Sequence, residues 1–188
     1  MKEKSQRPKV AVITDSIACL TRELVEQYGI EIIPINFYAG GKIYKDGVDI
    51  TSAEAYELFL KDPESFETSA PSPEDCLQAC RNAGKRAESI FCVTISVKIS
   101  AVYTVFQSIK EQAMSELPQT PIEVLDSGMA TAGEGFVAVV AARAAAEGKE
   151  LAGVVDAARD IKGKVRILLL LDTIRHVYRS GRVPKIAS

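Results

Sequence analysis

The sequence predicts an α/β fold with a mostly parallel sheet and flanking helices. Apolar, β-prone runs alternate along the chain with segments of helical period, which is typical of parallel strands joined by crossover helices. The runs are almost continuously apolar, as expected for strands that are covered on both faces. The chain has 188 residues, of which 47% are hydrophobic, so it can bury a substantial core.

Five apolar runs are the expected strands: KVAVIT from residue 9, EIIPINFY from residue 31, SIFCVTIS from residue 89, IEVLD from residue 122 and VRILLLL from residue 165. Apolar residues recur at helical spacing from Val102 to Ala113, and the alanine-rich segment GFVAVVAARAAAEGK closes on Gly148, a residue suited to a C-cap. Both segments are expected to be helices that pack on the sheet.

The segment of residues 38–60 does not fit this alternation. It contains a Gly-Gly turn, a polar strand and an Asp-Gly turn, followed by a short helix that Thr51 or Ser52 would cap. We expect this segment to be an excursion at the edge of the sheet.

Composition excludes several classes of function. Lys and Arg number 23 and Asp and Glu number 25, which gives a net charge of -2 without a basic stretch for nucleic acid. The first residues lack the apolar core of a signal peptide, and the longest apolar run, VRILLLLD, is too short to span a bilayer. We therefore expect a cytoplasmic protein with no stable membrane anchor and no nucleic-acid partner.

Motifs for catalysis, metals and cofactors are weak. The only histidine, His176, has no nucleophile elbow to support it. The sequence GEGFVA from Gly133 matches a dinucleotide-binding pattern, but it lies inside an expected helix. We therefore expect no catalytic residue, no metal and no cofactor. None of the cysteines has the spacing of a zinc site, so reduced, buried thiols are expected at Cys19, Cys76, Cys80 and Cys92.

The segment FETSAPSPED, which begins at residue 66, carries hydroxyl groups just before an expected helix. Ser72 suits the N-cap and Pro73 suits the first helical position, so both have a structural explanation. Thr68 and Ser69 precede this cap and are not explained by it. We expect them on a loop that a proline stiffens.

Further hydroxyl groups follow three other expected strands. Ser96 ends one strand and Ser100 lies near the start of the next helix, while Ser127 and the segment TDSIACL follow two others. Each of them could simply cap a helix, but together they would form a rim where α/β sheets bind ligands. A rim of hydroxyls and helix N-termini without a P-loop lysine suits a carboxylate or another small oxyanion.

Six segments together resemble the DegV family, in order and with sensible spacing: VITDSIACL, IIPINFYAGGKIYKDGVDIT, ETSAPSPED, TISVKISAVYTVF, VLDSGMATAGEG and LLLLDTIRHVYRSGRVPK. The resemblance covers nearly the whole chain from Val10 onward. It is most specific in YKDGVDIT and in TSAPSP, which is similar to the family's TSQPSP.

The resemblance implies a two-lobed α/β fold that buries one long-chain fatty acid between its lobes. It also implies a non-catalytic role, because such proteins are the fatty-acid-binding subunit of bacterial fatty acid kinase and offer the carboxylate to a separate kinase subunit. By motif position, Thr68 and Ser96 would bind the carboxylate. Ser69 and Ser100 would be their neighbours, and the Val97 amide would be a further donor.

The family pattern also suggests how the chain is organised. We expect a disordered tail over residues 1–8, a DegV-like α/β lobe over residues 9–171, and only the start of a second lobe over residues 172–188. Six residues depart from the family motifs: Val97, Lys98, Ala101 and Val102 stand where ISSGLSGTYQ has Ser, Gly, Gly and Thr, Ala70 replaces a glutamine, and Ser180 replaces a glycine.

Two other functions stay open at this point. The same rim could serve a small α/β enzyme or binding module for a nucleotide or carboxylate metabolite. A truncated lobe could instead associate as a homodimer through an apolar face that the missing lobe leaves uncovered.

Overall fold

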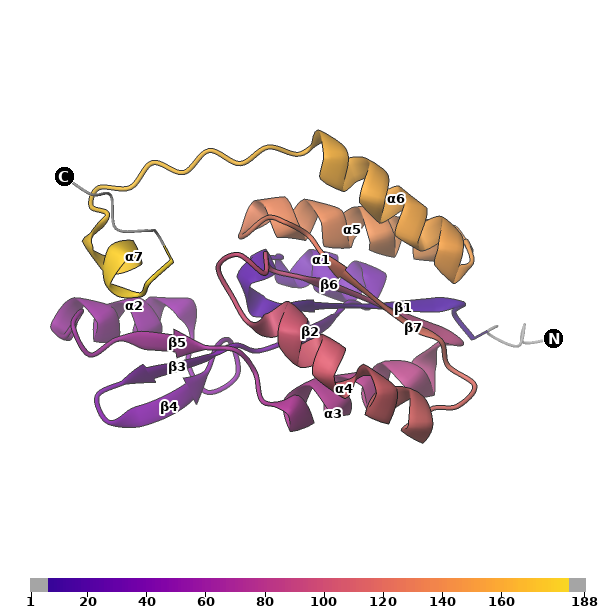
Figure 1. Cartoon of the computed structure of the whole chain (residues 1–188), viewed down its shortest axis with the longest axis horizontal. Helices are drawn as coiled ribbons and strands as arrows, with labels where there is room; N and C mark the ends of the chain where they lie inside the picture. Colours follow the sequence, from indigo (N-terminus) through magenta and orange to yellow (C-terminus); the bar gives the residue numbers. More distant parts are fainter. Residues whose placement is uncertain (1–6, 183–188) are drawn as a thin grey trace.

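The computed structural model describes residues 7–182 and shows two sheets of different size (Figure 1). The larger sheet has four parallel strands in the order β2-β1-β6-β7. All residues of the central strands β1 and β6 are buried, because helices cover both of their faces. The predicted α/β class is therefore confirmed. The strand bounds are β1 Val10–Asp15, β2 Glu31–Ile33, β6 Ser89–Thr94 and β7 Ile122–Asp126.

Helices pack on both faces of the larger sheet (Figure 1). α3 and α4 form one core with Ile13, whereas α5 and α6 form another with Val12 and Phe91. The neighbouring residues Val12 and Ile13 enter different cores, as alternating side chains of a strand must. The helix bounds, including α1 that contacts α5, are α1 Arg22–Tyr28, α3 Pro73–Arg86, α4 Val102–Glu116, α5 Ala132–Ala146 and α6 Leu151–Lys164.

The smaller sheet is antiparallel, with the order β4-β3-β5, and α2 and α7 lie on one side of it (Figure 1). Residues 38–39 and 42–45 of the segment of residues 38–60 lie in this sheet, and α2 begins at residue 52 of the same segment. That segment was expected at the edge of the larger sheet, but it helps to build a sheet of its own. The bounds are β3 Asn36–Ala39, β4 Lys42–Lys45, β5 Glu67–Ser69, α2 Ser52–Lys61 and α7 Arg175–Arg179.

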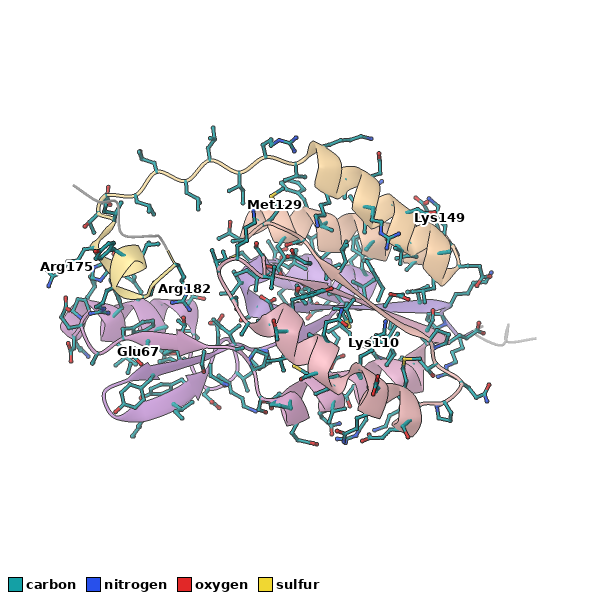
Figure 2. All side chains as sticks on the ribbon, viewed as in Figure 1. Glu67, Lys110, Met129, Lys149, Arg175 and Arg182 are labelled. Carbon is teal, nitrogen blue, oxygen red and sulfur yellow. The ribbon has the colours of Figure 1, made fainter. Side chains whose placement is uncertain are left out.

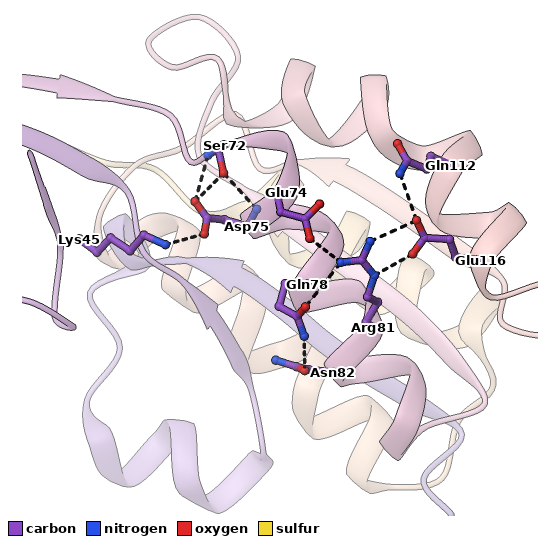
Figure 3. A network of polar contacts seen from close by, with 9 residues as sticks. All are labelled: Lys45, Ser72, Glu74, Asp75, Gln78, Arg81, Asn82, Gln112 and Glu116. Atoms are coloured by element: carbon purple, nitrogen blue, oxygen red, sulfur yellow. Dashed lines mark hydrogen bonds and ion pairs between the residues drawn. The ribbon is translucent and has the colours of Figure 1, made fainter.

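Helix α3 begins as predicted (Figure 3). The Asp75 N–H donates to Ser72 Oγ at 3.1 Å, and the Ser72 N–H donates to the Asp75 carboxylate at 3.3 Å. The same carboxylate pairs with Lys45 of β4 at 2.6 Å, which ties the smaller sheet to the start of α3. Further along α3, Arg81 pairs with Glu116 of α4 at 2.7 Å. These contacts fix the smaller sheet and α4 relative to α3.

Two other predicted helix ends are confirmed. The Glu54 N–H donates to Thr51 Oγ1 at 3.3 Å, so Thr51 caps α2. Gly148 lies just past the end of α5 with a φ of 82°, in the left-handed region that glycine adopts without strain.

The sequence suggested that the run EIIPINFY is one strand, and this prediction is wrong. It supplies β2 to the larger sheet and β3 to the smaller one, with Pro34 between them. Proline has no N–H for a ladder hydrogen bond, so Pro34 interrupts the pairing. The expectation of a loop at Thr68 and Ser69 is also wrong, because both lie in β5, where Thr68 pairs with Phe37.

The prediction of a strand from Val165 to Leu171 is wrong as well. This segment runs from α6 towards α7 and pairs with no strand among residues 7–182 (Figure 1). The side chains of Leu168 and Leu170 are 98% and 99% exposed. A strand needs a neighbour for its backbone groups, so an apolar run without one remains irregular.

The prediction that the cysteine side chains are buried is confirmed at three positions and wrong at one. Cys76 and Cys80 on α3 and Cys92 on β6 are buried, whereas Cys19 is exposed. Cys19 follows the short helix η1, Ser16–Ala18, and has a φ of 51°. All four thiols are free.

Parts of the predicted domain division lie outside the described residues. The structure does not describe residues 1–6 of the expected tail or residues 183–188 of the expected second lobe. The division of the chain into tail, lobe and second-lobe start therefore stays a prediction.

Candidate functional site

The carboxyl ends of β1, β6 and β7 meet at one edge of the larger sheet. Asp15 is the last residue of β1, Ser96 lies two residues past β6, and Ser127 directly follows β7. The Ser96 N–H donates to Met129 O at 2.8 Å, and the Ser127 N–H donates to Thr94 O at 3.0 Å. Polar residues from three strands thus share this edge, next to the start of α4, whereas Thr68 and Ser69, which the rim hypothesis placed with them, lie in the smaller sheet.

The serine hydroxyls of this edge have structural partners. Ser16 Oγ accepts from a backbone N–H at 3.2 Å, and Ser96 Oγ accepts from the Lys98 N–H at 3.3 Å. A hydroxyl that accepts one hydrogen bond still has a proton to donate. Ser96 can therefore hold its turn and donate to a ligand oxygen at the same time.

A tight turn from Ser96 to Ser100 leads into α4. The N–H groups of Ile99 and Ser100 both donate to Ser96 O, at 3.0 and 3.1 Å. Within the described chain, no side chain caps the start of α4, whose N-cap is Ala101. The first amides of α4 therefore lack a side-chain acceptor, an arrangement that suits an anion.

The Val97 amide, which was predicted to donate to a ligand, has an internal partner. It donates to Asp126 Oδ1 at 3.2 Å, and the same oxygen accepts from the Gly128 N–H at 2.9 Å. The carboxylate bound at this amide is therefore one of the protein's own. A ligand could use the Val97 amide only by displacing Asp126.

Thr68 and Ser69 lie on the smaller sheet, and Arg182 links this sheet to the Ser96–Ser100 turn (Figure 2). Arg182 Nη2 donates to Thr68 Oγ1 at 3.3 Å, and its Nε donates to Ile99 O at 3.0 Å. Ser69 is exposed and pairs with Asn36 in the sheet. The structure thus connects Thr68 with the turn that carries Ser96 and Ser100.

A hollow of about 580 Å³ opens beside Thr68. The guanidinium groups of Arg179 and Arg182 line part of it, and the rings of Phe59 and Phe66 line another part. Figure 2 shows Arg182 between α7 and β5, and Glu67 on β5 itself. Glu64, Glu67 and Ser180 line it as well, so the hollow combines charged side chains of both signs with aromatic rings beside Thr68.

Ion pairs hold α7 against this region. Arg179 pairs with Glu64 at 2.7 Å, and Arg175 pairs with the same carboxylate at 2.8 Å. The hydrogen bond from Arg179, together with the charge of Arg175, holds the pKa of Glu64 below its usual value. These contacts place Arg182, which follows α7 closely, next to Thr68.

A second, more apolar hollow of about 290 Å³ adjoins the first. It lies between α2 and the smaller sheet, and the residues Phe59, Phe66 and Thr68 line both hollows. The ring of Phe66 stacks on Phe37 at a centroid distance of 5.1 Å and meets Phe59 edge-on at 5.5 Å. None of the residues of α2 is buried, so this helix covers the aromatic cluster loosely. The charged hollow beside Thr68 thus adjoins a hollow that aromatic side chains line.

Sequence reasoning missed Arg182, Arg179 and the aromatic pair Phe59 and Phe66. The turn SGR carried a usable signal, because a glycine at this place favours a sharp turn of the chain. Gly181 does adopt a φ of 72°. The aromatic residues had no comparable signal, since their contacts join α2, β3 and β5 across the smaller sheet.

The described residues also limit other kinds of site. Within residues 7–182, no group of three or more His, Cys, Asp or Glu side chains is placed to hold a metal ion. No helix in the described part of the chain combines the length and the apolar character needed to cross a bilayer. His176 packs edge-on against Phe59, with ring centroids 5.2 Å apart.

Known sequences share the pattern of this chain. A family model described as an uncharacterised protein of the DegV family matches residues 9–188. A DegV domain-containing protein of Caldanaerobacter subterraneus is 31% identical over 180 residues, which is 96% of this chain and 62% of that protein. Another, from Clostridium perfringens, is 30% identical over 174 residues, 93% of this chain and 61% of that protein. The chain spans about three fifths of the length of these relatives.

Solved structures share the fold. A fatty-acid-binding DegV family protein from Thermus thermophilus is 27% identical, with a TM-score of 0.71, over 82% of this chain and 54% of that one. A stearic-acid-binding protein from Eubacterium ventriosum is 26% identical, with a TM-score of 0.71, over 78% of this chain and 51% of that one. A DegV family protein from Ruminococcus gnavus has a TM-score of 0.82 at 22% identity, covering 95% of this chain and 63% of that one.

Proposed function

The chain belongs to the DegV family, and from this premise we propose that it binds one long-chain fatty acid and offers the carboxylate to a separate kinase. Two similar solved proteins are described as binding fatty acids, which supports the choice of ligand. In the proposal the carboxylate lies between Thr68, Arg182 and the Ser96–Ser100 turn. The acyl chain enters the aromatic hollow, and the protein itself carries out no chemistry.

Arg182 is the residue that would balance the charge of the carboxylate. Its guanidinium has five donors, of which two are directed at Thr68 Oγ1 and Ile99 O, so others are left for a ligand. Thr68 Oγ1 accepts from Arg182 and keeps its own proton for a ligand oxygen. Ser96 adds a second hydroxyl, with Ser69 and Ser100 nearby. The start of α4 adds a favourable interaction of about 0.3–2 kcal/mol.

The acyl chain would supply most of the affinity. Each buried CH₂ group contributes about 0.8 kcal/mol, so a long chain can exceed the association cost of about 4–15 kcal/mol. The rings of Phe37, Phe59 and Phe66 give it an apolar surface directly beside Thr68. Head and tail of one fatty acid would thus meet at the border of the two hollows.

The phosphoryl chemistry is assigned to a partner. An acyl phosphate forms when a carboxylate oxygen attacks the γ-phosphorus of ATP and ADP leaves. The chain contains no P-loop sequence, so ATP and Mg²⁺ would be held by the kinase subunit. Thr68 is exposed, and a carboxylate beside it would be within reach of a docked enzyme. We place this reaction in the cytoplasm.

One observation carries the proposal. The contact of Arg182 with Thr68 brings a cation and a hydroxyl to the border between a charged and an aromatic hollow. An amphipathic anion with a long tail matches both environments, whereas a small polar metabolite would leave the aromatic hollow unused.

Binding is tested by mass spectrometry of the purified, denatured protein and by titration with palmitate and oleate. We expect a co-eluting fatty acid, or uptake of an added one after lipid removal. Protein that stays empty in both measurements would overturn the proposal.

Thr68→Val and Ser96→Ala test the head-group assignment. Each variant should keep its fold, and each should weaken fatty-acid binding and acyl phosphate formation in a kinase-coupled assay by about tenfold, since a hydrogen bond to a charged group contributes about 1.5–3 kcal/mol. Ser108→Ala, which removes a hydroxyl on the exposed side of α4, is the matched control. Unchanged turnover in both test variants would show that the assignment is wrong.

A further inference from the structure

Two buried carboxyl groups lie directly behind the candidate carboxylate site. Asp15 ends β1 and Glu134 lies in the first turn of α5, and both residues are fully buried. Their side chains are within hydrogen-bonding reach of each other. Two ionised carboxylates in contact inside a protein core repel each other strongly, so one of them must carry a proton.

The hydrogen bonds decide which group carries that proton. Asp15 Oδ1 accepts from the Ile17 N–H at 3.0 Å, and Oδ2 accepts from the Ile95 N–H at 3.0 Å, which favours an ionised Asp15. Glu134 Oε1 accepts from the Thr14 hydroxyl at 3.0 Å, whereas no N–H or O–H among residues 7–182 donates to its Oε2. Glu134 is therefore the protonated group, and it donates to Asp15.

The sequence around Glu134 is built for this close approach. A Cβ atom at Gly135 would overlap Ala18 O, and one at Gly133 would overlap a neighbouring side chain. Glycine at position 135 therefore lets the start of α5 approach η1, which directly follows β1, whereas the Ile167 side chain beside Gly133 is flexible and could move. Thr131, the N-cap of α5, has a φ of 51° and a ψ of -139°, which a β-branched residue rarely adopts. The start of α5 thus combines a close approach with backbone strain.

We propose that Asp15 and Glu134 share one proton and, as a pair, position Ser96 for ligand binding. Asp15 holds the amide of Ile95, the residue that directly precedes Ser96. Loss of the pair would release the end of β6 and the Ser96–Ser100 turn with it. Both carboxyl groups are positioning residues, since neither would touch the ligand. The role for Ser96 rests on the proposed function, whereas the shared proton does not.

Asp15 and Glu134 gain and lose protons together, as a pair, in this part of the core. Burial, followed by the charge of Asp15, raises the pKa of Glu134 to about 10, and burial also raises the pKa of Asp15. Among residues 7–182, the other titratable groups that face the pair are the Asp46 carboxylate, which lines a hollow together with Asp15, and two thiols. Burial raises the pKa of Cys19 above 9.0 and that of Cys76 to about 12, so both stay neutral below pH 9.

Thermal unfolding of the wild type and of Glu134→Gln between pH 4.5 and 9 tests the shared proton. In this range the folded state keeps a proton that Glu134 releases on unfolding, so the free energy of unfolding falls as the pH rises. Glutamine supplies a donor without binding a proton. We expect the variant to have the higher Tm at pH 8, with a difference that shrinks towards pH 4.5. Parallel curves for the two proteins would overturn the shared proton.

Carboxyl ¹³C NMR of the wild type gives a second test that needs no variant. One buried glutamate should keep the chemical shift of a protonated acid at pH 7. Titration of every glutamate near its usual pKa would overturn the proposal.

The positioning role is tested by hydrogen exchange at the Ile95 amide and by fatty-acid affinity. Glu134→Ala should speed exchange at Ile95 at least tenfold and weaken binding, and Glu134→Gln should restore both. Unchanged exchange in the alanine variant, or a failure of glutamine to rescue it, would overturn the role. If the pair behaves as expected but no form of the protein binds a fatty acid, the proposed function fails and the shared proton stands.

Discussion

At the scale of single residues, Arg182 is the side chain on which the candidate site depends most. It contacts Thr68 on the smaller sheet and Ile99 at the edge of the larger one. Its planar guanidinium can direct separate N–H groups at these two oxygens and at a ligand, which an ammonium group on a flexible stem does less well. The residue therefore acts through its geometry as well as its charge.

Substitution of Arg182 separates charge from geometry. Arg182→Met should weaken fatty-acid binding by about tenfold or more, because it removes a charge-assisted hydrogen bond of about 1.5–3 kcal/mol. Arg182→Lys should restore only part of the affinity. Isothermal titration measures both, with Arg159→Met on the exposed face of α6 as the control. Equal affinities for all four proteins would contradict the role of Arg182.

Residue roles that depend on local chemistry could be predicted from the sequence. The caps Thr51 and Ser72 were identified because a cap involves only the next three residues. The partners of Val97 and Thr68 could not be identified, because Asp126 and Arg182 come from distant parts of the chain. Such contacts are set by the tertiary path of the chain.

At the scale of elements, the start of α5 is strained in the structure. A residue held in a sparsely populated backbone region costs about 1–3 kcal/mol, and Thr131 is β-branched as well. Helix α5 therefore begins at an energetic cost, and its glycines and Glu134 account for the position it adopts.

Thr131→Gly should relieve this strain. We expect the free energy of unfolding to rise by about 1 kcal/mol, somewhat less than the strain because glycine loses more backbone entropy on folding. Urea denaturation measures the change. Glu111→Gly in the exposed middle of α4 is the control and should lower stability by about 1 kcal/mol. A loss of stability in both variants would show that Thr131 is not strained.

The strands β1, β6 and β7 were predicted well from their apolar composition, whereas the outcome at the other two runs depends on which backbone lies beside them. Four of the five apolar runs supply strands, but Pro34 divides one run between two sheets. The run Val165–Leu171 has strand composition and no strand partner within the described residues. Composition gives the tendency to form a strand, and the neighbouring backbone decides whether one forms.

At the scale of the whole molecule, the leucines of the segment between α6 and α7 are exposed, and this segment pairs with no strand among residues 7–182. Such surfaces favour association between chains. The exposed leucines would be the contact surface of the homodimer that the sequence left open.

Leu168→Lys combined with Leu170→Lys should weaken self-association. We expect the wild type to show a light-scattering mass that rises with protein concentration, and the double variant to remain monomeric at the same concentrations. Val48→Lys, at another exposed apolar residue, is the control. Equal association of the wild type and the double variant would show that another surface is responsible.

Two passages of the chain between its sheets contain a proline, Pro34 after β2 and Pro71 after β5. Proline fixes φ near −65°, and the ion pair of Lys45 with Asp75 holds the smaller sheet at a third point. These restraints limit movement of the smaller sheet, so we expect the hollow beside Thr68 to be open before a ligand arrives. A fatty acid would not have to wait for a slow rearrangement of the sheets, so stopped-flow association should stay proportional to ligand concentration, without a plateau.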